Sequence, residues 1–157
     1  MSIYRFARIT GGALLAVGAL AACDSMPPIE TGKPGKVVEM KATMTPAKEI
    51  PPKSGSGQGY AVMWYNEGTR ALNWKVYYAG LSGPATAAHI HGPADQTANA
   101  GVVIPLVQGA PSSPMTGSAT LTEAQAADMM AGKWYVNVHT QANAGGEIRG
   151  QIMPEAW

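Results

Sequence analysis

Apolar and polar residues alternate one by one in short runs along the chain, and this pattern constrains the fold more than any other feature. The clearest run is 134–139, which is followed by a turn at 141–146 and a second run at 148–152. Successive side chains of a β-strand point to opposite faces, so alternation gathers the apolar residues of a run on one face. The two runs predict a hairpin whose apolar face consists of Trp134, Val136, Val138, Ile148 and Ile152.

Further runs of the same kind are bounded by Gly, Pro, Ser or Asn. They predict strands at 38–45, 60–65, 72–78, 85–91, 102–107 and 118–121, with a hairpin turn at 66–68. We expect Trp64 and Trp74, like Trp134, to face inward and fill the core. About eight short strands at regular spacing predict an all-β fold, a Greek-key β-sandwich. A charged fraction of 13%, with 19 Gly and 12 Pro, suits such a turn-rich chain.

One short helix is expected to interrupt the strands. The run 123–131 consists of good helix formers, and Thr122 stands three residues before Gln125, as in a capping box. Gly132 follows directly and suits the end of a helix. Met129 and Met130 are interpreted as packing residues of this helix.

The N-terminus has the pattern of a secretion signal. Arg5 and Arg8 precede a small, apolar stretch that ends at Leu20-Ala21-Ala22-Cys23, which resembles a bacterial lipobox. We expect 1–22 to be a lipoprotein signal peptide and Cys23 to be acylated as the first mature residue. Cys23 is the only cysteine, so no intramolecular disulfide can form. The alternatives are an uncleaved anchor or a chance cysteine after an ordinary signal.

The mature chain is expected to work at a membrane surface. Residues 23–36 contain Pro and Gly without periodicity and are interpreted as a lipid-anchored tether, followed by one domain at 37–157. Asp24 directly after the cysteine resembles an inner-membrane retention signal, which favours the periplasmic side of the inner membrane. Without the signal the chain has nine basic and ten acidic residues, so a nucleic-acid partner is not expected.

The chain has three histidines, and two of them form the pair His89-Ile90-His91. Side chains at 89 and 91 of a strand share a face, so the pair can grip one metal ion. His139 faces outward from the last predicted hairpin and could join them from a neighbouring strand. Three imidazoles form a site that copper, and next zinc, accepts. The alternative is that each histidine only makes hydrogen bonds on the sheet.

The register of the last hairpin predicts the surroundings of this site. Pairing of Val138 with Ile148 places a carboxylate across from His139, where it could orient the imidazole. We therefore expect three neighbouring residues to support the ligands: Glu147, Arg149 and Asn137. A fourth ligand would have to be Asp95, Glu147 or water. No serine lies in a nucleophile elbow, so a nucleophilic triad is not expected.

Several of these residues lie in motifs that resemble the CHRD domain family. The motifs are Ala88-His89-Ile90-His91-Gly92-Pro93, the stretch Gly132 to Thr140, the stretch Gly145 to Ile152, and Glu49-Ile50-Pro51-Pro52 with Lys48 in place of the usual Asn. The resemblance implies a CHRD-like domain of a bacterial lipoprotein. A weaker likeness is to the copper site of Cu/Zn superoxide dismutase, onto which His89, His91, His139 and Arg149 can be read. The sandwich is accordingly expected to be immunoglobulin-like or superoxide-dismutase-like.

These patterns favour a periplasmic lipoprotein that binds one copper or zinc ion through His89, His91 and His139, for metal handling or redox protection. A second hypothesis is a metal-free module that recruits an envelope protein or glycan. A third is a mononuclear copper or zinc enzyme, but the sequence shows neither an open coordination position nor a substrate cleft.

Overall fold

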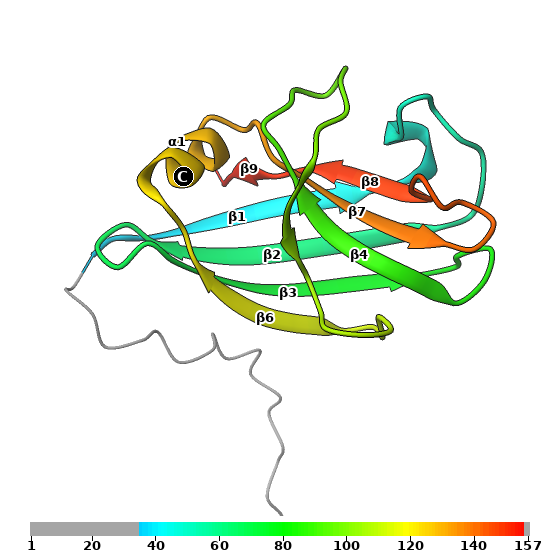
Figure 1. Cartoon of the computed structure of the whole chain (residues 1–157), viewed down its shortest axis with the longest axis horizontal. Helices are drawn as coiled ribbons and strands as arrows, with labels where there is room; N and C mark the ends of the chain where they lie inside the picture. Colours follow the sequence, from blue (N-terminus) through cyan, green and yellow to red (C-terminus); the bar gives the residue numbers. More distant parts are fainter. Residues whose placement is uncertain (1–34, 156–157) are drawn as a thin grey trace, which may run out of the picture.

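The structure, a computed structural model, describes residues 35–155 of the chain. The described chain forms two antiparallel sheets that pack face to face, with one helix beside them (Figure 1). The strands are β1 (Val37–Met44), β2 (Gln58–Asn66), β3 (Ala71–Ala79), β4 (Ala85–His91), β5 (Val102–Pro105), β6 (Met115–Thr120), β7 (Tyr135–Thr140), β8 (Ile148–Gln151) and β9 (Met153–Pro154), and the helices are the 3₁₀ turn η1 (Pro46–Lys48) and α1 (Glu123–Met130).

The strand order reflects a Greek-key connection. One sheet has the order β6-β3-β2-β1-β9 and the other the order β5-β4-β7-β8. Strand β5 follows β4 as its hairpin partner, β6 then crosses to the first sheet, and β7 returns to pair with the free side of β4. The expectation of an all-β sandwich is confirmed. The return of β7 beside β4 brings two segments far apart in sequence onto one sheet.

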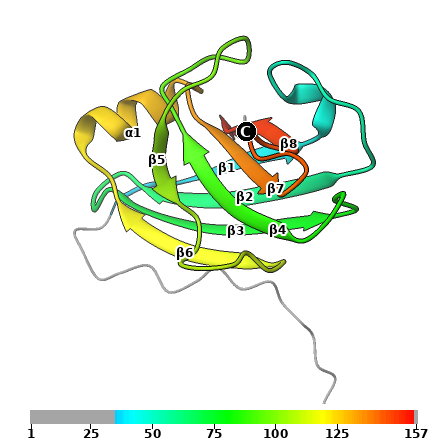
Figure 2. The ribbon, with the colours of Figure 1, turned by 45° about the vertical axis from the view of Figure 1, so that its right-hand side comes forward.

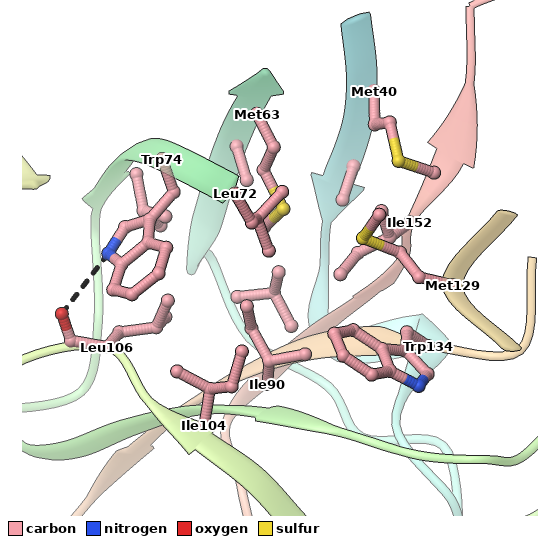
Figure 3. Close-up of a cluster of buried hydrophobic side chains, with 14 of the residues drawn as sticks. Met40, Met63, Leu72, Trp74, Ile90, Ile104, Leu106, Met129, Trp134 and Ile152 are labelled. Carbon is pink, nitrogen blue, oxygen red and sulfur yellow. Dashed lines mark hydrogen bonds between the residues drawn. The ribbon is translucent and has the colours of Figure 1, made fainter. Parts of the chain in front are cut away.

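The core between the sheets consists of apolar side chains, most of them large. Trp74 and Trp134 fill much of it, and the indole of Trp74 donates a hydrogen bond to the carbonyl of Leu106 at 3.2 Å (Figure 3). Each fully buried Leu, Ile or Met side chain of the core stabilises the fold by roughly 1.5–3 kcal/mol relative to an exposed one. Other residues drawn in the figure come from both sheets and from α1, namely Met40, Met63, Leu72, Ile90, Met129 and Ile152.

One predicted core residue lies elsewhere. Trp64 is only half-buried and faces outward from β2, whereas its neighbours Met63 and Tyr65 are buried. Both faces of β2 carry large apolar residues, so periodicity alone did not distinguish the inner face. The pairing of Met40 with Met63, both in the core, sets the observed orientation.

One strand differs from its predicted limits by more than two residues, and one strand was not predicted. Strand β6 begins at Met115 rather than at 118, because Gly117 occupies an inward position and hides the alternation. A Cβ at Gly117 would lie 2.4 Å from Cζ2 of Trp74, so the indole takes the space of a side chain. The short strand β9, which was not predicted, pairs with β1 through Met40 and Lys41.

The helix agrees with its sequence signals. Thr122 accepts a hydrogen bond from the backbone of Gln125, whose side chain in turn accepts from the backbone of Thr122. Gly132 has a φ of +71°, the left-handed conformation that ends helices. No helix within residues 35–155 is both long and apolar enough to span a bilayer.

Two loops lie over the outer face of the four-stranded sheet. Residues 45–57 and 92–101 rise on the same side of β7 and β8 (Figure 2). The side chain of Asn99 in one loop donates a hydrogen bond to the carbonyl of Ile50 in the other. As a result, outward-facing residues such as Asn137 and Arg149 are only 3% and 1% exposed.

Candidate metal centre

The three histidines meet on the outer face of the four-stranded sheet. His89 and His91 lie in β4, and His139 lies in β7, which pairs with β4. The register places Asn137 opposite His89, so His139 is the diagonal neighbour of His89. The intervening Ile90 is fully buried in the core. The convergence predicted from strand geometry is confirmed, and the site lies outside the sandwich.

The imidazoles are close enough to share one ion. One nitrogen of each histidine lies within 4.8 Å of the others. Nδ1 of His89 and Nε2 of His139 are 3.1 Å apart. Two nitrogens bound to one tetrahedral zinc, each at 2.0–2.1 Å, would be roughly 3.4 Å apart. The first pair therefore already has the required spacing, and His91 must approach it to complete the site.

Backbone carbonyls hold two of the rings. Nδ1 of His91 lies 3.0 Å from the carbonyl oxygen of Ala100, and Nδ1 of His139 lies 2.9 Å from that of Ala144. A carbonyl only accepts hydrogen bonds, so each Nδ1 carries the proton and donates it. In a neutral imidazole this leaves the lone pair on Nε2. This is the usual arrangement around metal-binding histidines, whose other nitrogen donates to an oxygen.

One of these lone pairs has no partner among residues 35–155. Nε2 of His91 is buried, and no described residue makes a hydrogen bond with it. His91 as a whole is only 9% exposed. A buried acceptor without a partner costs about 1–3 kcal/mol, which an ion at this nitrogen would offset.

The environment keeps the histidines neutral. Burial lowers the pKa of His89, His91 and His139 below the ordinary value of 6.5. The neighbouring imidazoles lower the pKa of His89 further, because a second positive charge beside a first is unfavourable. Neutral imidazoles are the form that binds metals, so these lowered pKa values favour ion binding near neutral pH.

Tyr135 supports His91. Their rings stack with centroids 5.0 Å apart and planes 5° apart. The hydroxyl of Tyr135 accepts a hydrogen bond from the backbone N–H of Ala100 and donates to its carbonyl, at 3.1 and 3.3 Å. The same carbonyl holds His91, so Tyr135 fixes both the imidazole and its hydrogen-bond partner.

Arg149 fastens the loop 92–101 over the site. Its guanidinium carbon lies 3.5 Å from the ring centroid of Tyr135. The guanidinium donates to the side chain of Asn99 at 2.9 Å and to the carbonyls of Asp95 and Ala98 at 3.1 and 2.8 Å. The predicted pairing of Arg149 with Asn137 is confirmed. Arg149 reaches His91 through Tyr135 and the loop rather than by direct contact.

Glu147 does not orient His139, contrary to the sequence-based expectation. Its carboxylate accepts hydrogen bonds from the backbone and hydroxyl of Ser82, both at 2.6 Å, from Thr140 at 2.6 Å and from Asn143 at 3.1 Å. Burial raises the pKa of Glu147, but these hydrogen bonds outweigh it and lower the pKa below its ordinary value. With four donors available elsewhere, the carboxylate turns to them, and the Ala144 carbonyl takes its place at His139.

Asn137 and Glu49 form a buried pair beside His89. The amide of Asn137 donates to Oε1 of Glu49 at 2.7 Å, and Glu49 is 4% exposed. Burial raises the pKa of Glu49 to about 7, although Lys53 and Arg149 oppose this rise. Sequence reasoning placed Glu49 in a family motif without a role. Only the fold of loop 45–57 over the sheet brings it to Asn137.

The fourth coordination position is not supplied by a carboxylate of the described chain. The carboxylate of Asp95 accepts hydrogen bonds from the backbone and hydroxyl of Thr97, at 2.8 and 2.6 Å. Among residues 35–155, only the three histidines form the cluster that could hold a metal. Water is therefore the ligand that remains from the predicted set.

The fold and the site together define a class: an antiparallel β-sandwich protein with three histidines gathered on the outer face of one sheet. The CHRD domain family model matches residues 40–152, and the chain belongs to this family. The match begins within β1, ends after β8 and contains all three histidines. A search of curated proteins and a search of solved structures each found no match. The predicted signal peptide 1–22, Cys23 and Asp24 lie outside the described residues.

Proposed function

We propose that this protein binds one copper ion through His89, His91 and His139, with zinc as the second choice, and serves metal handling or redox protection at the periplasmic membrane surface. The observation that carries this proposal is the buried, unpartnered Nε2 of His91 beside two other imidazoles within 4.8 Å. An ion at this point accepts three lone pairs at once.

Copper is preferred to zinc because of the donor set. Imidazole suits both ions, and divalent copper binds a given nitrogen site more tightly than zinc does. Three neutral nitrogens add no negative charge, so the ion keeps its full charge. Because only three protein ligands are present in the cluster, the fourth position is left to an exchangeable ligand. These features suit storage or transfer of the ion.

Metal titration of the purified full chain tests the proposal. We expect calorimetry to give one equivalent of Cu²⁺, and of Zn²⁺ in a separate titration, with submicromolar dissociation constants. His91→Ala and His139→Ala should each weaken binding at least about 100-fold while circular dichroism remains that of the sandwich. Asp95→Asn, a change in the loop beside the site, is the control and should leave the affinity unchanged. Weak binding by the unaltered chain, or binding unaffected by His91→Ala, would contradict the proposal.

Attachment to the membrane is a separate part of the proposal. It is supported by the lipobox-like residues before Cys23 and by the absence of any other cysteine in the sequence. Two or three acyl chains, at about 0.8 kcal/mol per buried methylene, anchor a protein stably. Expressed in a Gram-negative bacterium, the full chain should incorporate labelled palmitate and fractionate with the inner membrane.

The variants of this segment separate anchoring from sorting. Cys23→Ser should abolish palmitate incorporation, whereas Asp24→Ser should keep the label and move the protein toward the outer membrane. Incorporation that persists in Cys23→Ser would rule out the anchor, and an unchanged distribution of Asp24→Ser would rule out the sorting signal. Neither result bears on metal binding.

A further inference from the structure

A groove of about 480 Å³ lies on the five-stranded sheet, on the side of the sandwich away from the histidines. It is lined by Tyr60, Tyr77 and Tyr78 together with small polar residues that include Thr43, Thr45 and Ser113. Its volume is within the range of small-ligand sites. None of the residues that line it contributes to the candidate metal centre.

The sheet sets the tyrosines side by side. Thr43, Tyr60 and Tyr77 occupy one row across β1, β2 and β3, and all three face outward. Tyr60 is 38% exposed, so its ring is available to a ligand. Val62 and Trp64 continue the same face of β2, and both are half-buried.

The third tyrosine follows Tyr77 directly in β3, so its ring faces the core rather than the outer row. The hydroxyl of Tyr78 donates to the carbonyl of Pro111 at 3.0 Å, and its backbone N–H donates to the hydroxyl of Ser113 at 3.0 Å. These contacts attach the segment 111–113 to the end of β3. The part of the lining that Ser113 supplies is therefore fixed to the sheet by hydrogen bonds.

The lining identifies the chemistry of a ligand. Its residues are uncharged: the outward-facing phenol rings of Tyr60 and Tyr77 are accompanied by hydroxyl groups and by the amide of Gln58. Aromatic rings pack against C–H surfaces, and Tyr, Thr, Ser and Gln both donate and accept hydrogen bonds. A neutral molecule that combines C–H faces with many hydroxyls meets both requirements. Sugars have this combination.

Other macromolecules fit less well. No lysine or arginine is part of the described lining, although Nζ of Lys75 lies 5.3 Å from the ring centroid of Tyr77; a nucleic-acid backbone needs several such cations. Tyr60 and Tyr77 lie in strands that are hydrogen-bonded on both sides, so a peptide could not add there as an extra strand. We propose that this groove binds a neutral sugar chain through stacking on Tyr60 and Tyr77.

The proposal is tested by titrating the purified full chain with cellohexaose and, separately, with chitohexaose. We expect saturable binding of at least one hexasaccharide in calorimetry. Tyr60→Ala and Tyr77→Ala should each weaken it at least about 10-fold, whereas Tyr60→Phe, which keeps the ring, should retain most of the affinity. Val102→Ala changes an exposed apolar residue on the other sheet and is the control; Val102 is 54% exposed.

Binding should be independent of the metal site. A variant with all three histidines replaced by alanine should bind the sugar with unchanged affinity. Failure of both hexasaccharides to bind at millimolar concentration would overturn the sugar proposal, as would binding that survives both tyrosine-to-alanine changes. Either result leaves the metal proposal untouched, because the copper titration is a separate measurement.

Discussion

Nε2 of His139 lies 3.1 Å from Nδ1 of His89, although 50 residues separate the two histidines in the chain. Because Nδ1 of His139 already donates to Ala144, the proton shared in this contact belongs to His89. For Nδ1 of His89 to bind an ion, that proton must leave and His89 must adopt its other tautomer. Ion binding would therefore replace the hydrogen bond between His89 and His139.

Tyr135→Phe tests whether the hydrogen bonds between the hydroxyl of Tyr135 and the backbone of Ala100 position His91. The change keeps the stacked ring but removes the hydroxyl that holds the backbone of Ala100. We expect copper affinity to fall about 10-fold, the lower end of the usual effect of losing an outer hydrogen bond. Tyr78→Phe also removes a buried hydroxyl contact, on the far side of the sandwich, and should leave copper affinity unchanged. Equal copper affinities of the two variants would show that the hydrogen bonds of Tyr135 do not position His91.

Arg149→Lys should destabilise the fold by about 2–4 kcal/mol. Lysine cannot reproduce the planar contacts of a buried guanidinium with Asn99, Asp95 and Ala98. The loss should appear in urea unfolding followed by circular dichroism. Lys48 has an exposed contact with the backbone of Thr43, so Lys48→Arg provides a cation exchange that should change stability little. An Arg149→Lys protein as stable as the unaltered chain would contradict the role given to this residue.

Glu49 should make stability depend on pH near neutrality. Its pKa is about 7 in the fold and 4.5 as the ordinary value, so folding favours the protonated form. This contribution is fully present below pH 4.5 and is lost as pH rises through 7. Lys53 and Arg149 face the carboxylate and limit the loss, which we expect to be of order 2 kcal/mol.

Glu49→Gln keeps an oxygen that accepts from Asn137 and removes the charge. Its stability, measured by urea unfolding between pH 4.5 and pH 9, should decline less between pH 4.5 and pH 7 than that of the unaltered chain. Glu67→Gln, a change at an exposed turn residue, should leave the pH profile as it is. If the Glu49→Gln and unaltered profiles run parallel from pH 4.5 to pH 7, Glu49 is not the titrating group.

Gly117→Ala should destabilise the sandwich by about 1–3 kcal/mol. The added Cβ would lie 2.4 Å from Cζ2 of Trp74, and the indole cannot move without losing packing and its bond to Leu106. Gly83→Ala isolates the backbone effect of removing a glycine, because a Cβ there meets nothing within 4 Å. Thermal unfolding of both variants measures the difference. If Gly117→Ala and Gly83→Ala have the same melting temperature, Trp74 accommodates the methyl group.

The sequence predicted those parts of the site that depend on strand geometry. Alternation around Val138 and its pairing with Ile148 correctly placed His139 outward and Arg149 opposite Asn137. The outward face of His89 and His91 followed from Ile90 in the same way. These predictions succeeded because the period of a strand is fixed and the core selects one face.

The parts that depend on loops could not be predicted. Glu147 turns toward Ser82, which comes from a different connection, and Glu49 reaches Asn137 only because loop 45–57 folds over the sheet. The predicted orientation of Trp64 was wrong for another reason: both faces of β2 carry large apolar residues. The ring holders Ala100 and Ala144 act through backbone carbonyls, which every residue type has, so their identity carries no signal.

X-ray absorption spectroscopy of the copper-loaded full chain tests the central claim most directly. The account predicts three imidazole nitrogens at about 2.0 Å from the ion, reduced to two in His91→Ala. A first shell of oxygen ligands, or an imidazole count that His91→Ala leaves unchanged, would contradict it.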